Sequence, residues 1–72
     1  MFTQRETEVI ELMIKGLNNG EIAEKLNITK HTVKAHLSHI YEKMNVTGRV
    51  QATFKYAGII NNNLENIKKP VN

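Results

Sequence analysis

The apolar residues between Thr29 and Met44 recur at the spacing of a helix. Val33, Leu37, Ile40 and Met44 are separated by four, three and four positions, and at about 100° per residue these positions lie on one side of an α-helix. That side must face a hydrophobic core. The opposite side carries His31, Ala35, Ser38 and Glu42, flanked by Lys34 and His39. Such a face of short and polar residues beside cationic ones is typical of a helix that enters a DNA groove.

The residues before Thr29 predict two more helices. Thr3 and Glu6 have the spacing of a capping box, so a first helix begins there and ends near Gly16. Asn18 and Glu21 repeat this spacing and begin a short second helix. The first helix is expected to provide a broad apolar face, formed by Val9, Ile10, Leu12, Met13 and Leu17.

A tight turn is predicted between the second and third helices. Asn27 tolerates a left-handed backbone conformation, and Thr29 is a good N-cap for the helix that follows. Helix, tight turn and helix therefore follow one another directly, which is the order of a helix-turn-helix motif.

A fourth helix is expected after a short loop. Thr47 is available to cap it, and Gly58 marks its expected end. We therefore predict an all-α fold, a compact four-helix domain over residues 1–60 with a flexible C-terminal tail at 61–72. On the fourth helix, Val50, Phe54 and Ala57 are expected to pack, whereas Ala52, Thr53 and Tyr56 are expected to form a surface that pairs with a second copy.

The composition excludes several classes of protein. The 72 residues include no cysteine, so disulfides and Cys-ligated zinc are excluded, and no apolar run approaches the roughly 20 residues that span a bilayer. The amino terminus has no secretion signal, so we expect a cytoplasmic protein without a membrane partner. The net charge is +3, and four of the seven acids precede Ala23. The cations after Ala23 include Lys30, Lys34, Lys43, Arg49 and Lys55, a distribution that favours a polyanionic partner.

Neither catalysis nor metal binding is predicted. The sequence has no Gly-rich phosphate loop and no suggestive Ser-His-Asp set, so we predict that the protein is not an enzyme and needs no cofactor. His31, His36 and His39 share the third helix, but no nearby Asp or Cys completes a metal-ligand set. If protonated, these histidines would strengthen phosphate binding.

Four linked segments resemble the LuxR-type helix-turn-helix domain of bacterial transcription regulators. They are TQRETEVIELMIKG, NNGEIAEKLNIT, HTVKAHLSHIYEKM and NVTGRVQA, and they follow the order and spacing of that family from Thr3 to about Ala57. Two positions depart from the family pattern: Gly20 stands where a basic or polar residue is frequent, and Gly48 where Asn or Asp is frequent. The resemblance implies sequence-specific binding of double-stranded DNA in transcription regulation, as in the output domain of a response regulator.

The resemblance also implies roles for individual residues. The third helix is expected to enter the major groove, with Lys34, Ala35, Ser38 and His31 facing the bases. A second set is expected to hold phosphates or to brace the helices. These residues are Asn19, Thr29, Lys30, Thr32, His36, Lys43 and Arg49. For Arg49 both roles are open, because an arginine near a loop often locks one helix to another.

Two hypotheses for the partners follow. The resemblance implies a homodimer that pairs through the fourth helix on an inverted-repeat DNA site, with RNA polymerase as a further candidate partner. The alternative is a small helical module that sequesters another regulator through the same helix. A stand-alone regulator and the C-terminal domain of a longer one would carry the same residues.

Overall fold

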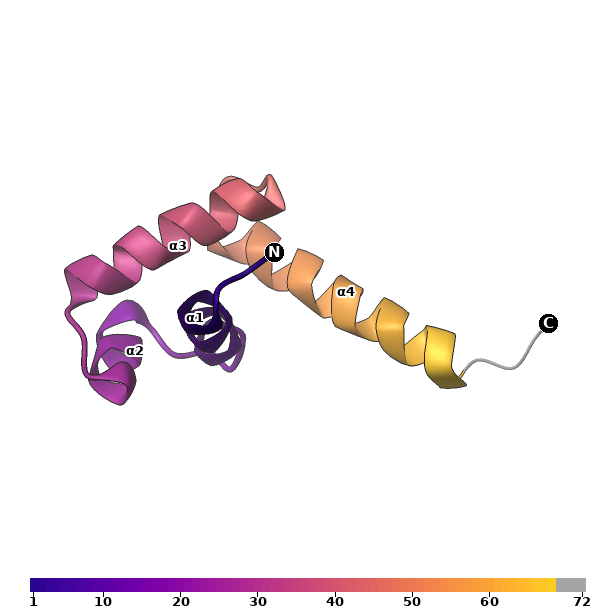
Figure 1. Cartoon of the computed structure of the whole chain (residues 1–72), viewed down its shortest axis with the longest axis horizontal. Coiled ribbons are helices and arrows are strands. Elements are labelled where there is room, and N and C mark those ends of the chain that lie inside the picture. Colours follow the sequence, from indigo (N-terminus) through magenta and orange to yellow (C-terminus); the bar gives the residue numbers. More distant parts are fainter. Residues whose placement is uncertain (69–72) are drawn as a thin grey trace.

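The computed structural model describes the backbone of residues 1–68 and the side chains of residues 1–58 (Figure 1). Four helices follow one another, and every regular element in the described backbone is a helix. The all-α, four-helix prediction is therefore confirmed. The helices are α1 (Gln4–Ile14), α2 (Asn19–Leu26), α3 (Lys30–Met44) and α4 (Arg49–Lys68). The first three form a cluster, and α4 starts beside the end of α3 and extends away from that cluster (Figure 1).

The predicted boundaries of α1 are confirmed. Thr3 is its N-cap: the Thr3 hydroxyl accepts from the Glu6 amide at 3.1 Å, and the Glu6 carboxylate accepts from the Thr3 amide at 2.8 Å. At the other end Gly16 has a φ of +99°, which a residue with a side chain rarely adopts, and its amide donates to the Met13 carbonyl at 3.0 Å. Local sequence alone thus fixes both ends of this helix.

The helix-turn-helix motif is also confirmed. Asn18 caps α2 in a second capping box with Glu21, with hydrogen bonds of 2.8 and 2.9 Å. Asn27 adopts the left-handed conformation with φ 57° and ψ 45°, and the amide of the next residue, Ile28, donates to the Ala23 carbonyl at 3.0 Å. Only residues 27–29 separate the end of α2 from the start of α3.

The core lies where α1, α2 and α3 meet and is closed by the first turn of α4. All four members of the apolar stripe on α3 are buried, as their spacing predicts. Full burial contributes roughly 1.5–3 kcal/mol for each large apolar side chain, so the three-helix junction supplies most of the stability of so small a domain. The buried apolar residues are Val9, Ile10, Met13, Ile22, Ala23, Val33, Leu37, Ile40, Met44 and Ala52.

The two sides of α4 are the reverse of those expected. Val50 and Phe54 are 68% and 75% exposed, whereas Ala52 is fully buried and Tyr56 packs partly against the core. Periodicity alone allowed either side to pack, and the small Ala52 side chain is the one that lets α4 approach the other helices closely. While Ala52 is packed in the core of its own chain, its side chain is therefore not accessible to a second copy.

The expected end of α4 is also wrong, because the helix continues through Gly58 to Lys68. A glycine inside a helix costs about 1 kcal/mol relative to alanine, but it does not remove a hydrogen bond. Gly16 ends α1 because its φ is positive, and Gly58 does not share that conformation. The division between a domain at 1–60 and a tail at 61–72 stays a prediction, and residues 69–72 lie outside the described chain.

The start of α4 uses Thr47 differently from the expected cap. The Gln51 side-chain oxygen accepts from the Thr47 amide at 2.9 Å and from the Thr47 hydroxyl at 3.1 Å. The Ala52 amide donates to the Gly48 carbonyl at 3.0 Å. Gly48, the second departure from the family pattern, thus occupies the cap position, and Gln51 ties the preceding loop to the helix.

Candidate nucleic-acid interface

The structure places the four candidates for base contact together on α3. His31, Lys34, Ala35 and Ser38 are all exposed on the side of α3 that faces away from the core. Ala35 and Ser38 are short, so the backbone of α3 can approach a partner surface closely at this point. Lys34 brings a cationic donor beside them. Such a surface fits the edges of base pairs in a groove.

The first turn of α3 is held by two threonines. The Thr29 hydroxyl accepts from the Thr32 amide at 3.1 Å and lies 2.9 Å from the Thr32 hydroxyl. Thr29 is exposed and Thr32 is half-buried, so these two residues shape the amino end of the helix that presents Lys34. Their expected contact with phosphate stays a prediction.

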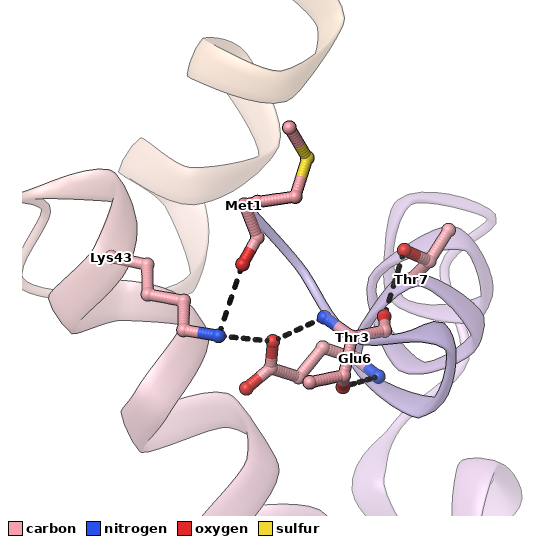
Figure 2. A network of polar contacts seen from close by, with 5 residues as sticks. All are labelled: Met1, Thr3, Glu6, Thr7 and Lys43. Carbon is pink, nitrogen blue, oxygen red and sulfur yellow. Dashed lines mark hydrogen bonds and ion pairs between the residues drawn. The ribbon is translucent and has the colours of Figure 1, made fainter.

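Lys43 braces α3 against α1. Its ammonium donates to the Glu6 carboxylate at 2.7 Å and to the Met1 carbonyl at 3.1 Å (Figure 2). Glu6 is only 4% exposed, and the hydrogen bond from Lys43 and then the one from the Thr3 amide hold the pKa of its carboxyl below the ordinary value, against the effect of burial. Lys43 was expected either to hold a phosphate or to brace the helices, and this contact is of the bracing kind.

Arg49 makes a second brace, at the start of α4. One guanidinium nitrogen donates to the Met13 carbonyl at 3.2 Å and also to the Leu17 carbonyl. Because these carbonyls lie at the end of α1 and just beyond it, Arg49 fixes α4 to the α1–α2 connection. Tyr41 packs nearby, and burial raises the pKa of its hydroxyl, although the positive charge of Arg49 opposes this.

Lys55 provides a third brace that the sequence analysis missed. Its ammonium donates at 2.7 Å to the Met44 carbonyl at the carboxyl end of α3. Cations are favoured at this end of a helix, but the contact joins two helices and has no local sequence signal. Of the five cations singled out after Ala23, three are therefore bonded within the protein, and Lys30 and Lys34 remain.

The three histidines do not gather into a metal site. His31 and His39 are exposed, and His36 is half-buried. Among the residues that the structure describes, no group of three His, Cys, Asp or Glu side chains is arranged to hold a metal ion. Nor does any helix in the described chain have the length and apolar character needed to cross a membrane.

These features define a class of protein, the helix-turn-helix DNA-binding domains, with α3 as the exposed second helix of the motif. The model of the bacterial regulatory proteins of the luxR family matches residues 1–56. The chain belongs to that family, and it is a LuxR-type DNA-binding domain of a transcription regulator.

Relatives of known class agree with this assignment. The chain is 50% identical over 52 residues to the transcriptional regulatory protein DegU of Brevibacillus brevis, a match that covers 72% of this chain and 22% of DegU. It is 41% identical over 56 residues to the nitrate/nitrite response regulator protein NarP of Escherichia coli, covering 78% of this chain and 26% of NarP. The chain thus spans about a quarter of the length of these relatives.

A solved structure shares the fold. It contains the anti-activator RapF in complex with the DNA-binding domain of the response regulator ComA, and the match has a TM-score of 0.73 at 33% identity. It covers 75% of this chain and 93% of the matched chain. The four-helix arrangement is therefore that of a response regulator DNA-binding domain.

Proposed function

We propose that this domain binds a specific sequence of double-stranded DNA by placing α3 in the major groove. The observation that carries the proposal is the division of α3 into two sides: one is buried in the core, and the other presents His31, Lys34, Ala35 and Ser38 to solvent. The Lys34 ammonium donates to a base edge. The Ala35 methyl group and the Ser38 hydroxyl also contact base edges, but their contacts discriminate less strongly between base pairs.

Phosphate contacts surround this helix. Lys30, Thr29 and Thr32 lie at the amino end of α3, and Asn19 begins α2. Amide groups at helix amino ends and a nearby ammonium favour a phosphate there. The internal hydrogen bonds of Lys43 and Arg49 support a bracing role for these two residues and leave fewer cations to contact the DNA backbone. His36 is half-buried and stays in the phosphate or bracing set.

On DNA, two copies pair through α4 on an inverted-repeat site. Two α3 helices must then lie about one helical turn of DNA apart. The exposed side of α4 that supports pairing carries Val50, Phe54 and Ala57, because Ala52 is buried within its own copy. In the bacterial cytoplasm the bound dimer would regulate transcription, with RNA polymerase as a further partner.

A second candidate function uses the same exposed side of α4. Val50 and Phe54 are large apolar residues that the described part of the chain leaves uncovered. In a similar solved structure, a response regulator DNA-binding domain is in complex with an anti-activator protein. A module that captures another regulator through α4 is therefore the alternative to a DNA-bound homodimer.

Selection from a pool of random duplexes tests the proposal. The domain is expected to enrich an inverted repeat, and a variant with Lys34→Ala is expected to lose that enrichment. A pool that returns no common sequence, together with stable complex formation on mixing with a second regulator, would instead establish the alternative.

A further inference from the structure

The sequence contains one Asn-Gly pair, Asn19 and Gly20, and the structure places it in the first turn of α2. Asparagine is a chemically labile residue, because the backbone nitrogen of the next residue can attack its side-chain amide. A following glycine favours this attack, since it has no β-carbon to hinder the nitrogen. The pair arises at Gly20, the first of the two departures from the family pattern.

The Gly20 amide and the Asn19 carboxamide are both free of hydrogen bonds to the described residues. In the capping box, the Glu21 amide donates to the Asn18 side chain at 2.8 Å, and the Ile22 amide donates to the Asn18 carbonyl at 2.9 Å. The Gly20 amide is the second of the helix and precedes both of these donors, so it has no acceptor within the helix. The side chain of Asn18 is thus held by the cap, whereas that of Asn19 is available to react.

A shallow depression at this peptide brings two cations to it. The start of α3 contributes Lys30, and the start of α4 contributes Arg49. Lys30 is exposed and has no carboxylate partner among the described residues, and the guanidinium of Arg49 is fixed by the Met13 carbonyl at 3.2 Å. These charges and the positive end of the α2 dipole favour the negative charge that develops when the Gly20 amide loses its proton.

We propose that Asn19 is a site of spontaneous deamidation, and that the cations of this depression accelerate the reaction. The deprotonated Gly20 nitrogen attacks Cγ of Asn19, so that an N–C bond forms, the Cγ–Nδ2 bond breaks and ammonia leaves with the amide proton. Water then opens the resulting succinimide ring to an aspartate or an isoaspartate, and no atom is oxidised or reduced. The attack requires Asn19 to leave its helical conformation, which costs little in the first turn of a helix because helix ends open locally.

Deamidation replaces a neutral amide with a carboxylate, and the aspartate product has two effects. A negative charge at the first residue of α2 stabilises the helix through its dipole. The same charge attracts the Lys30 ammonium and repels a polyanion, so the affinity for DNA falls as the molecule ages. This consequence rests on the proposed DNA-binding function, whereas the reaction itself does not.

Incubation of the folded domain at mildly alkaline pH, followed by fragmentation mass spectrometry of its peptides, tests the reaction. Asn19 is expected to gain the mass of an amide-to-acid exchange before its neighbour Asn18, and Gly20→Ala is expected to abolish this gain. The variant keeps the fold, because a β-carbon at Gly20 lies 3.4 Å from its nearest neighbour, the Asn18 side-chain oxygen, which is an ordinary contact. The proposal is overturned if Asn19 stays intact in the folded domain while the urea-unfolded chain converts, or if it converts equally fast in Gly20→Ala.

The same measurement on lysine variants tests the role of the depression. Lys30→Gln is expected to slow the conversion of Asn19, because it removes a positive charge beside the reacting nitrogen. Lys15→Gln is the matched control, because Lys15 is an exposed lysine outside this depression. Equal rates in Lys30→Gln and in the unchanged domain would overturn the acceleration by the depression.

Asn19→Asp, which has the side chain of the aspartate product, tests the consequence for DNA binding. It is expected to raise the melting temperature and to weaken duplex binding. Gln4→Glu is the matched control, because it adds the same charge at the first residue of α1, outside the depression, and is expected to leave duplex binding nearly unchanged.

The outcomes separate this inference from the proposed function. If the unchanged domain binds no duplex, DNA binding itself is wrong, and the mass measurements still decide whether Asn19 deamidates. If the domain binds and Asn19→Asp binds equally well, DNA binding stands and the loss of affinity on deamidation is overturned.

Discussion

Among residues 1–58, Glu6 is the one acid that is buried, and its partner Lys43 comes from the far end of α3. Because its pKa is lowered in the folded protein, the carboxylate contributes stability at pH values above its ordinary pKa, and this contribution is lost as the pH falls through the lowered value. Glu6→Gln is expected to cost about 1.5–3 kcal/mol at neutral pH, as expected for a hydrogen bond to a charged group.

Thermal unfolding between about pH 7 and pH 3 checks this contribution. The difference in melting temperature between Glu6→Gln and the unchanged protein is expected to shrink as the pH falls. Glu11→Gln removes the same charge from an exposed position of α1 and serves as the control. A difference that stays constant over this range would show that the charge of Glu6 does not stabilise the fold.

Lys34 is expected to affect DNA binding alone. Lys34→Ala should weaken binding to the selected duplex by about 1–3 kcal/mol if the ammonium contacts a base. The melting temperature should change little, because Lys34 is exposed and outside the core. Fluorescence anisotropy with selected and scrambled duplexes measures the loss, with Lys15→Ala as the control. An equal loss on both duplexes would assign Lys34 to a phosphate instead.

At the scale of whole helices, the features that could be predicted from the sequence are those that depend on residues close together in the chain. The starts of α1, α2 and α3 each depend on a cap and an amide three residues later, and such pairs are visible in the sequence. The exposed face of α3 followed from its apolar stripe in the same way. Contacts between distant residues, such as those of Lys43 and Lys55, could not be predicted, because no local pattern records the partner.

The packing of α4 shows this limit most clearly. Its weakly patterned sequence allows two apolar sides, and the choice between them depends on the fit of Ala52 against the other helices. A small buried residue carries a weaker hydrophobic signal than the exposed Phe54. Periodicity therefore predicted the helix but assigned its sides the wrong way round.

Pairing through α4 can be tested by changing one side at a time. Phe54→Ser is expected to reduce the cooperativity of binding of two copies to an inverted repeat without lowering the melting temperature, because Phe54 is exposed. Ala52→Ser is expected to lower the melting temperature, because it places a hydroxyl in the core at a cost of about 1–3 kcal/mol if unpaired. Unchanged cooperativity in Phe54→Ser would remove this side of α4 from the dimer interface.

For the molecule as a whole, net charge is a poor guide to how strongly the domain attracts DNA. The formal charge is +3, but Lys43, Arg49 and Lys55 donate to groups within the protein. The cations left on and around the proposed DNA surface are concentrated at the amino end of α3. We therefore expect affinity to depend on few phosphate contacts for each copy, with selectivity aided by dimer spacing and DNA shape.

Salt dependence distinguishes cations that brace the fold from those that contact DNA. Each phosphate contact adds about 0.9 to the slope of log affinity against log salt. Lys43→Gln and Lys55→Gln are expected to lower the melting temperature and to leave this slope unchanged, because both ammonium groups already have protein acceptors. Lys34→Gln, by contrast, is expected to leave the melting temperature unchanged and to weaken binding. If Lys43→Gln instead lowered the slope by about one phosphate contact, the ammonium must leave Glu6 when DNA binds, and α3 would then move relative to α1.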